Sequence, residues 1–567
     1  MSNILIQQRP YLTRPEDIQG VAPFIADLLA RRGVQSAQEL ELKLKHLHAP
    51  NLKGLEQAIE LIDQAIDTQE KIVIVGDYDA DGATSTALMI LALREMGADV
   101  EYLVPDRFKY GYGLTPAIAD LAFVTYTPDM LITVDNGISS HAGVEQAQAH
   151  GMQVIITDHH LTTKATPQAE AVVNPNQLGC EFPSKALAGV GVAFYVLANL
   201  ASHRKKCGKS SANLSQYLDL VALGTYADVA SLDLNNRILI DAGLKRIQQG
   251  LCRPGISALL DIAGRDPKSL KAQDLGFVIG PRLNAAGRME TMDIGIECLI
   301  AADLSTAYPL AQQLNQLNVE RRQVEGQIKQ EALAELEHIQ LDHDDLPAAL
   351  IMFEQHWHQG VIGIVAGRLK EQFHRPAIVF AADEDGIHIK GSARSIEGIH
   401  IRDSIERIAE LHPHLVSHFG GHAAAAGLTI QKQHFAEFKT AFEALIAEQD
   451  ESLFQATIWT DGVLPDLAFN VDTVEILQNL SPWGQKFPAP VFDGKFKIID
   501  YRWLKDVHLK LKVALDNGQM VEAIAFNAAD KYDFNPMLDQ VHLVYELDKN
   551  EYRGNVSLQL RVLHLMQ

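Results

Sequence analysis

Cysteine is scarce in this chain. The four cysteines, Cys180, Cys207, Cys252 and Cys298, stand far apart and form no Cys-x-x-Cys pair. Zinc ribbons and disulfide frameworks need closely spaced or regularly paired cysteines, so this spacing argues against both kinds of protein. We expect the four thiols to be buried or incidental.

Long hydrophobic runs are also missing. The longest apolar stretch that is nearly free of charge, residues 186–201, contains two glycines and is too short to span a bilayer. The N-terminus places Gln7, Gln8 and Arg9 soon after a brief apolar start, which is not the layout of a signal peptide. We therefore expect a cytoplasmic protein with no membrane partner.

Positive charge is in deficit. The chain has 49 Lys and Arg against 72 Asp and Glu, a formal net charge of −23. Affinity for nucleic acid normally depends on Lys and Arg that neutralise phosphates, so the balance excludes a uniformly basic polyanion binder. Metal ions on an acidic cluster reverse the local field, however, and nucleic acid can then bind through local patches.

The chain is long enough to bury several cores. At 567 residues and 47% hydrophobic content, it is expected to form roughly three or four domains. Residues 1–70 read as mostly helical, with helices predicted at 22–29, 38–47 and 55–68. From Lys71 the pattern changes to strands at 72–75, 100–104, 130–134 and 154–157, with helices at 84–96 and 139–150 between them. This alternation predicts βαβ units and a parallel sheet.

Metal-binding residue types follow three of these strands. Asp77 and Asp79 follow the first, Asp135 another, and the run 158–160, Asp-His-His, a third. Because ligands bind at the carboxyl ends of parallel strands, the three groups are predicted to converge at one sheet edge. Carboxylate and imidazole donors suit Mn²⁺ or Mg²⁺, and two such clusters can hold two ions. Asp228, after an apolar helical run that we expect to end at Gly224, is a fourth contributor.

Each group alone has an ordinary structural explanation. Asp-rich turns commonly cap helices, and paired histidines are more often surface or core residues than ligands. Three such groups at one sheet edge are harder to explain separately, which favours a metal site for phosphoryl transfer.

Motifs in the chain resemble the DHH phosphoesterase superfamily. The segments that carry this resemblance are GDYDADG at 76–82, TVDNG at 133–137 and DHH at 158–160. Three more are similar to the branch of single-stranded-DNA-specific 5′-to-3′ exonucleases, namely RFKYGYG at 107–113, LGTYADV at 223–229 and GPRLNAAGRM at 280–289. Three further segments resemble the companion domain of that superfamily. They are HQGVIGIVAGRL at 358–369, GSARS at 391–395 and FGGHAAAAG at 419–427.

The resemblance implies roles for individual residues. Two divalent ions, Mn²⁺ or Mg²⁺, are expected on Asp77, Asp79, Asp135, His159 and Asp228, with Asp135 between them. His160 is expected to contact the scissile phosphate, and it shares the catalytic role with Asp77, Asp79 and Asp135. Asp81 and Asn136 are expected to support the ligands rather than bind metal. Some relatives carry a histidine where this chain has Val75, which leaves the ligand set of one ion open.

A second set of residues suits a terminal 5′-phosphate. Guanidinium groups bind phosphate in a bidentate manner and a hydroxyl adds a directed donor, so we expect a pocket closed from two domains. Its candidate residues are Arg107, Arg282, Arg288, Ser392, Arg394 and His422. A surface ion pair is the ordinary alternative for any one arginine, and close helix packing is the ordinary alternative for FGGHAAAAG.

The predicted fold is α/β. A parallel-sheet catalytic domain is joined by a long helix to a smaller α/β companion domain, and an all-β oligonucleotide-binding barrel follows. The predicted boundaries are 1–70 for an N-terminal helical region packed on the catalytic domain, 71–305 for the catalytic domain, 306–345 for the linking helix, 346–450 for the companion domain and 451–567 for the barrel.

Two segments support this layout. Residues 311–341 have the periodicity of an amphipathic helix of roughly 45 Å, for which a coiled-coil arm is the alternative. Near the C-terminus, strands are predicted at 508–513, 520–526 and 556–562, with a turn at 516–518. Lys510 and Lys512, together with Tyr501 and Trp503, are candidates to bind a single strand there, though Trp503 is as readily a core residue.

We therefore expect a metal-dependent 5′-to-3′ exonuclease that hydrolyses single-stranded DNA to nucleoside 5′-monophosphates and acts in DNA repair and recombination. The resemblance also implies a single-stranded-DNA-binding protein and a helicase as partners, and we expect a monomer. Two alternatives stay open: a phosphodiesterase acting on short oligonucleotides or cyclic dinucleotides, and a catalytically inactive DNA-binding scaffold.

Overall fold

The computed structural model describes residues 4–105, 107–162, 165–338, 346–480, 482–529, 531–532, 534–535, 537–552 and 555–567. The chain forms two compact units. One holds the N-terminal residues through Gln7 together with Gln316–Ile458, and the other holds Gln8–Asn315 together with Trp459–Gln567. Within the described ranges, none of the helices is both long and apolar enough to cross a membrane.

The N-terminal region is only partly as predicted. It contains strand β1 (Leu5–Gln8), helices α1 (Pro23–Ala30) and α2 (Leu55–Thr68), and the short 3-10 turns η1 (Pro15–Asp17), η2 (Ala37–Leu40) and η3 (Leu44–His46). The helices predicted at 22–29 and 55–68 are confirmed, whereas the one at 38–47 is wrong. There the Glu39 carboxylate accepts the Ser36 N–H and starts one turn, but Glu41 leaves helical geometry at φ −82° and ψ 83°.

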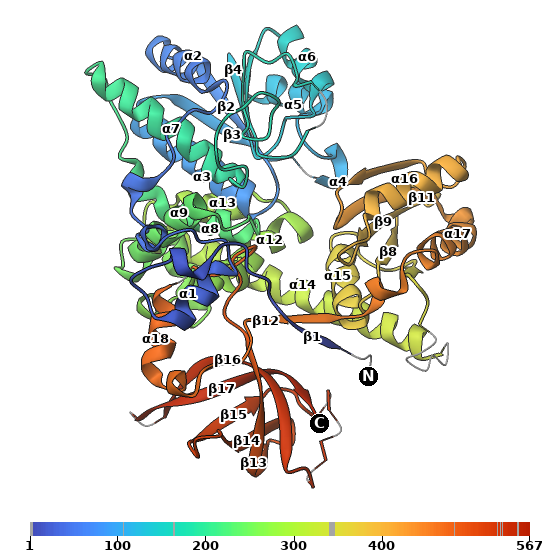
Figure 1. Cartoon of the computed structure of the whole chain (residues 1–567). Coiled ribbons are helices and arrows are strands. Elements are labelled where there is room, and N and C mark those ends of the chain that lie inside the picture. The colour runs from blue at the N-terminus through green and yellow to red at the C-terminus, as the bar shows by residue number, and fades with distance from the viewer. Residues whose placement is uncertain are drawn as a thin grey trace. The chain divides into compact units, whose positions relative to one another are not determined.

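A fully parallel sheet forms the first domain. Its strand order is β3-β2-β4-β5-β6, with bounds β2 (Lys71–Gly76), β3 (Asp99–Leu103), β4 (Met130–Val134), β5 (Gln153–Thr157) and β6 (Ala171–Val173). Helices α5 (Pro116–Tyr126) and α6 (His141–Ala149) cover one face, and α2, α3 (Ala80–Glu95) and α7 (Gly189–Lys206) cover the other (Figure 1). Because both faces are covered, the central strands β2 and β4 are almost entirely buried and mostly apolar.

Helix α3 begins four residues earlier than predicted. The Asp79 side chain accepts the N–H groups of Asp81 and Gly82, at 2.9 and 3.0 Å, and caps the helix. Glycine is needed at position 82, because a Cβ there would lie 2.4 Å from the carbonyl oxygen of Asp77. The sequence Asp-Gly, which suggests a loop, is therefore the first turn of the helix.

The rest of this domain is helical. Its elements are α4 (Arg107–Tyr110), η4 (Leu214–Tyr217), α8 (Leu218–Ala227), α9 (Leu234–Gln248), α10 (Pro254–Ile262), η5 (Pro267–Ser269), α11 (Ala272–Asp274), the π-turn η6 (Leu275–Ile279), α12 (Gly280–Met289) and α13 (Asp293–Ile300). The expectation that Gly224 ends its helix is wrong, because α8 continues through it to Ala227. A Cβ on Gly224 would lie 2.2 Å from Thr84 Oγ1, so this glycine allows α8 to pack closely on α3.

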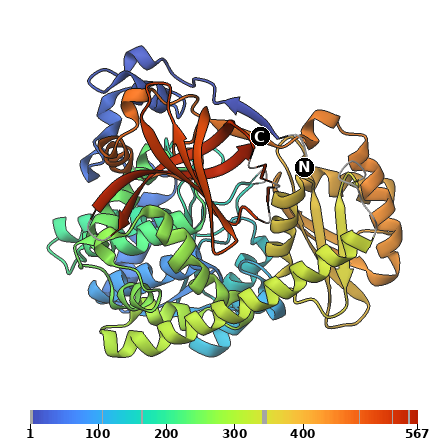
Figure 2. The same ribbon diagram turned by 90° about the horizontal axis from the view of Figure 1, so that it is seen from below.

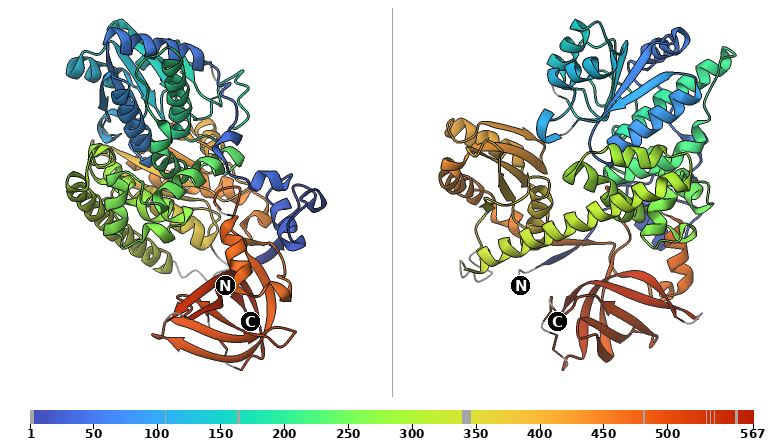
Figure 3. Two further views of the ribbon diagram at one scale, coloured as in Figure 1. Left: turned by 90° about the vertical axis from the view of Figure 1, so that its left-hand side faces the viewer. Right: turned by 180° about the vertical axis from the view of Figure 1, so that it is seen from behind.

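A single long helix leads out of the domain. Helix α14 (Leu304–His338) is one continuous ribbon (Figure 3), and it confirms the linking helix predicted from residue 311 as far as His338. Residues 339–341 of that prediction lie outside the described residues.

The companion domain has a mixed sheet of order β10-β11-β9-β8-β7. Its elements are β7 (Leu350–Glu354), α15 (Ile362–Phe373), β8 (Ala377–Ala382), β9 (His388–Arg394), α16 (Ile401–Leu411), β10 (His418–Gly421), β11 (Ala425–Gln431), η8 (Lys432–His434), α17 (Phe435–Ala447) and η9 (Glu451–Phe454). Only β7 and β8 run parallel. Helices α16 and α17 bury a cluster against one sheet face that includes Ile405, Phe438 and Phe380.

The C-terminal segment closes into a barrel (Figure 2). Strand β12 (Thr457–Thr460) pairs with β1, and η10 (Asp466–Ala468) and α18 (Val471–Asn479) follow. The barrel order is β13-β14-β15-β17-β16, with bounds β13 (Phe492–Leu504), β14 (His508–Ala514), β15 (Met520–Ala525), β16 (Gln540–Tyr552) and β17 (Asn555–Met566). A closed five-stranded barrel is the architecture of an oligonucleotide-binding fold, so the predicted fold class is confirmed.

Candidate metal centre and phosphate-binding residues

The parallel sheet has a switch point between β2 and β4. From β2 the chain passes to β3 on one side, and the later strands are added on the other side. Ligands of open α/β sheets bind outside the carboxyl ends of the strands at such a point. Asp77 follows β2 and Asp135 follows β4, so the first two predicted ligand groups flank it.

The predicted ligands come together there. In each of three groups the donor atoms lie within 4.8 Å of one another, and the groups are Asp77, Asp79 and Asp135; Asp135, His159 and His160; and Asp81, His159 and Asp228. Asp135 and His159 each belong to two of these groups. All five predicted metal ligands are therefore neighbours, although their sequence positions span 151 residues, from 77 to 228.

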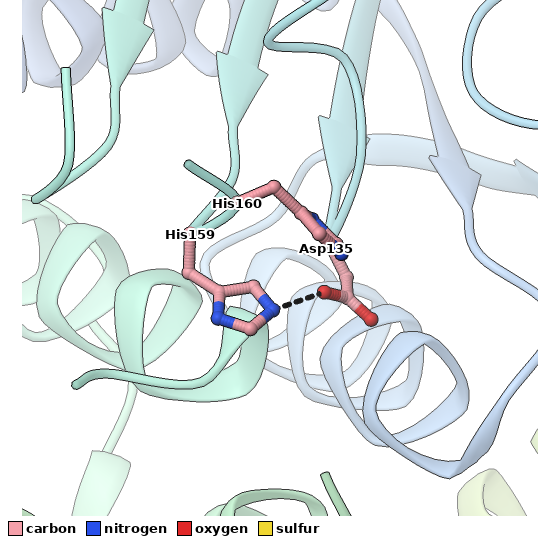
Figure 4. Close-up of side chains that lie close together, drawn as sticks. All are labelled: Asp135, His159 and His160. Carbon is pink, nitrogen blue, oxygen red and sulfur yellow. Dashed lines mark ion pairs between the residues drawn. The ribbon is translucent and has the colours of Figure 1, made fainter. Parts of the chain in front are cut away.

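Asp135 and His159 lie in direct contact within the cluster. His159 Nε2 lies 3.0 Å from Asp135 Oδ1, and both side chains point toward each other from adjacent strand ends (Figure 4). Both atoms are buried, and neither has a hydrogen-bond partner among the described residues. A buried carboxylate oxygen and a buried imidazole nitrogen that face each other at this distance fit the donor set of a bound divalent cation.

Burial and nearby charges strongly shift the pKa values of residues in the cluster. Burial, and then the nearby charges of Asp81, Asp79 and Asp77, raise the pKa of Asp135 well above its ordinary value. Burial also raises the pKa of Asp228, with Asp81 and Asp79 as further causes. Burial lowers the pKa of His159 to about 4, which leaves a neutral imidazole at pH 7. Crowded carboxylates and a neutral imidazole are a donor set that divalent cations stabilise.

Asp158 organises the histidine pair rather than joining the ligands. Its carboxylate accepts the N–H groups of His159 and His160 and, at 2.7 Å, contacts His160 Nδ1. It also accepts the N–H of Ile138, at 2.8 Å. The other side of the His160 ring meets the hydroxyl of Tyr112, 3.1 Å from Nε2. The sequence predicts no role for Tyr112, which lies in the motif RFKYGYG at 107–113.

Asp81 and Asn136 lie where supporting residues would lie. The Asp81 carboxylate accepts the N–H groups of Gly189 and Val190, at 2.6 and 2.9 Å, and so anchors the start of α7. The Asn136 amide donates to the carbonyl oxygens of Val75 and Val134, which ties the ends of β2 and β4 together. These contacts agree with a supporting role for both residues, which stays a prediction.

Backbone strain is concentrated at two positions of the site. Asp135 has φ 61°, and Val229, directly after Asp228, has φ 59°. A β-branched residue in the left-handed region is an outlier, and such outliers gather at functional sites. At Val75, where some relatives have histidine, the side chain is buried in the apolar core beneath α5.

Two of the arginines predicted to bind phosphate, Arg282 and Arg288, lie on helix α12 of the catalytic domain. Arg282 is 9% exposed, and it donates to Asn315 Oδ1 at 3.1 Å and to the Val278 carbonyl at 2.6 Å. Arg288 is half-buried on the same helix. The side chain of Arg107 lies outside the described part of the chain, so the prediction for it stays untested.

Ser392 and Arg394 form a compact pair on β9. Arg394 Nη1 lies 3.3 Å from Ser392 Oγ and donates to the Ala393 carbonyl at 2.9 Å. Helix α15 passes so close that a Cβ on Gly363 would lie 2.8 Å from Ser392 Oγ and 3.2 Å from Arg394 Nη2. Burial lowers the pKa of Arg394, and within the described ranges no carboxylate makes an ion pair with it. A half-buried guanidinium of this kind suits an anion.

The segment FGGHAAAAG forms a β-hairpin, and helix α16 packs against its two strands, so the ordinary alternative of close helix packing stays open. Strands β10 and β11 pair across it, and exposed His422 lies in the turn. Strand β11 places Gly427 opposite Ser392 and Ala425 opposite Arg394. The predicted companion-domain residues therefore share one region of the sheet.

The basic and aromatic candidates of the barrel come from strands β13 and β14, and their roles stay predictions. The register pairs Tyr501 with Leu511 and Trp503 with Leu509, so both rings are on the face of the buried leucines. Lys510 and Lys512 alternate to the opposite face, and Lys510 forms a 2.6 Å ion pair with Glu522. The two features belong to different faces of the hairpin.

Family models match three parts of the chain. The "DHH family, N-terminal domain" matches residues 71–225, the "DHHA1 domain" matches 346–448 and the "RecJ OB domain" matches 460–564. Together with the donor set at the sheet edge, these matches define the class of the protein as a DHH phosphoesterase.

Individual relatives cover the whole chain. Single-stranded-DNA-specific exonuclease RecJ of Dickeya dadantii is 48% identical over 574 residues, which is 99% of each chain. The Escherichia coli protein of the same name is 47% identical over 95% of each chain. The crystal structure of RecJ in complex with Mn²⁺ from Thermus thermophilus has a TM-score of 0.84 and 28% identity, and it covers 99% of this chain and 79% of that one. The chain belongs to the RecJ family.

Proposed function

We propose that this chain is a metal-dependent exonuclease that hydrolyses single-stranded DNA from the 5′ end to nucleoside 5′-monophosphates, in DNA repair and recombination. The observation that carries the proposal is the buried contact between Asp135 and His159 at the switch point. It is found in a chain that is 48% identical over its full length to a single-stranded-DNA-specific exonuclease.

Five residues are proposed to hold two divalent ions, Mn²⁺ or Mg²⁺. They are Asp77, Asp79, Asp135, His159 and Asp228, and Asp135 is the bridging candidate because its carboxylate belongs to two donor groups. When bound, such ions supply a water of lowered pKa and positive charge near the attacking and leaving oxygens. Crystal structures of a Thermus RecJ contain Mn²⁺ or Mg²⁺, which supports this assignment.

The remaining residues orient the reacting groups. Asp158 fixes the His160 ring from the Nδ1 side, and Nε2 faces the hydroxyl of Tyr112. Nε2 is therefore the ring atom that we assign as the donor to a non-bridging phosphate oxygen. Asp81 holds the start of α7, and Asn136 holds the ends of β2 and β4 next to Asp135. No covalent enzyme intermediate is required, because water is the nucleophile.

We propose phosphate-binding roles for two sets of residues, each within its own unit. Arg394, Ser392 and His422 contribute from the companion domain, and Arg107, Arg282 and Arg288 from the catalytic domain. The half-buried Arg394 guanidinium beside the Ser392 hydroxyl is the strongest element of this assignment.

Neither alternative is favoured. A phosphodiesterase for short oligonucleotides does not account for the barrel that matches the RecJ OB domain. An inactive scaffold does not need the intact donor set that this chain retains. We further propose a cytoplasmic monomer that works with a single-stranded-DNA-binding protein and a helicase, for which family membership is the support.

Oligonucleotides labelled at either end test the reaction directly. We expect single strands with a 5′ label to release that label as a mononucleotide when Mn²⁺ or Mg²⁺ is present, and not when a chelator is present. Duplexes of the same sequence should be degraded much more slowly. Release of the 3′ label first, or hydrolysis in chelator, would overturn the proposal. The readout is gel electrophoresis of timed samples.

The substitution Arg394→Ala tests recognition of the chain end. Loss of a charge-assisted contact to phosphate should slow hydrolysis of 5′-phosphorylated strands by roughly 10–100-fold and affect 5′-hydroxyl strands much less. The matched control is Arg407→Ala, an exposed arginine of the same domain that pairs with Glu410. Initial rates on the two substrates give the result, and an equal loss on both would argue against a phosphate contact.

A further inference from the structure

Helix α12 carries the motif GPRLNAAGRM, in which only the arginines have been given a role above. Another residue of the motif touches the metal-binding loop. Asn284 Oδ1 accepts the backbone N–H of Ala80 at 2.7 Å, across 204 positions of sequence. Ala80 is the first residue of α3 and stands directly after Asp79.

Gly287 holds the same loop from a second point. A Cβ at this position would lie 1.9 Å from the carbonyl oxygen of Tyr78, so the helix backbone is pressed against that carbonyl. Positions 284 and 287 are three residues apart and therefore lie on one face of α12. Residues on that face contact the loop at Tyr78 and at Ala80, which precede and follow Asp79.

The loop needs external support because of what it carries. The donor atoms of Asp77, Asp79 and Asp135 lie within 4.8 Å of one another, and like charges at this spacing repel. Asp79 also uses Oδ1 to accept two N–H groups of the first turn of α3. The N–H of Ala80 is another donor of that first turn that has no partner within the helix. Because Ala80 is only 2% exposed, the Asn284 oxygen accepts this N–H where water would otherwise bind.

We propose that Asn284 and Gly287 are positioning residues for metal binding: they hold the loop 77–80 in the shape in which Asp77 and Asp79 reach a common ion. This inference rests on the proposed metal site. It assigns to α12 a role in metal affinity that is separate from any phosphate contact of its arginines.

Metal affinity of the full-length protein, stripped by chelation, provides the test. Calorimetric titration of Asn284→Ala with Mn²⁺ should give a Kd raised by roughly 10–100-fold, as for other residues that orient metal ligands. Asn284→Asp keeps an oxygen that can accept the Ala80 N–H, so it should bind Mn²⁺ at least ten times more tightly than Asn284→Ala. If Asn284→Ala does not fold, Asn284→Ser gives the same comparison, because its shorter side chain does not reach Ala80.

A matched control separates positioning from stability. Asn470 also accepts a helix N–H, that of Thr473 at 2.8 Å, but it caps α18. Asn470→Ala should lower the melting temperature about as much as Asn284→Ala and leave the Mn²⁺ affinity unchanged. The proposal is overturned if Asn284→Ala binds Mn²⁺ as the unmodified protein does, or if Asp and Ala at 284 are equally weak. If the unmodified protein itself binds no Mn²⁺, the proposed metal site fails instead.

Discussion

Replacing Asp135 with asparagine should lower the rate of single-strand hydrolysis by roughly 10³-fold or more. This carboxylate belongs to two donor groups, so its loss weakens both proposed ion positions, and bound metal contributes several kcal/mol to transition-state stabilisation. Asparagine is the better replacement for a clean test, because the start of α7 packs tightly there. A Cβ on Gly189 would lie 2.6 Å from Asp135 Cβ, so the site tolerates little change of shape.

The measurement is the initial rate on a 5′-phosphorylated single strand, with Mn²⁺ raised until the rate no longer increases. Asp99→Asn is the control, since Asp99 is an exposed aspartate at the opposite end of the same sheet, on β3. It should keep the unmodified rate. Retention of more than a tenth of the activity by Asp135→Asn at saturating Mn²⁺ would exclude Asp135 as a shared ligand.

The convergence of the ligand groups was predictable because the signals are local. Each of β2, β4 and β5 is an apolar run followed at once by Asp or His, and parallel strands bring such ends to one edge. The same holds for α2, whose predicted bounds of 55–68 are those observed. Where local signals conflict, prediction failed. The Asp-Gly pair at 81–82 suggests a loop, but Asp79 caps a helix there.

The contacts that shape the site were not predictable from the sequence. Asp81 anchors the start of α7 more than a hundred positions later, and Asn284 accepts the N–H of Ala80 from α12. Neither residue type predicts such a role, because an aspartate in a turn and an asparagine in a helix are common. The prediction that Gly224 ends its helix is wrong for a similar reason. It looks like a helix end, but it is needed where α8 meets Thr84 of α3.

The largest effect on stability is expected from Asp461→Ala. Asp461 lies just before the barrel and pairs with Arg32, which follows α1, through two contacts of 2.8 and 2.9 Å. The two side chains are 2% and 0% exposed. Arg32 also donates to the Pro488 and Leu28 carbonyls, both at 2.7 Å, which fixes it in place. Removing the carboxylate leaves this cation buried without a counter-ion, a change that costs about 3–5 kcal/mol.

Differential scanning calorimetry with limited proteolysis can measure this effect. We expect the first thermal transition to shift down by several degrees, and new cleavage sites to arise near residue 461 and near α1. Glu41→Ala is the control, because Glu41 and Lys43 form a pair in which both side chains are more than half exposed, and its loss should cause no measurable shift.

A second variant distinguishes the pair from its surroundings. Arg32→Met combined with Asp461→Ala removes both charges of this pair, so Arg32 is not left buried without its counter-ion, and part of the lost stability should return. If the double variant is no more stable than Asp461→Ala, the destabilisation arises instead from the other partners of Asp461, which are the Val491 N–H at 2.9 Å and Arg9 Nε at 3.9 Å. In that case Asp461 stabilises the fold through these contacts and not as the partner of Arg32.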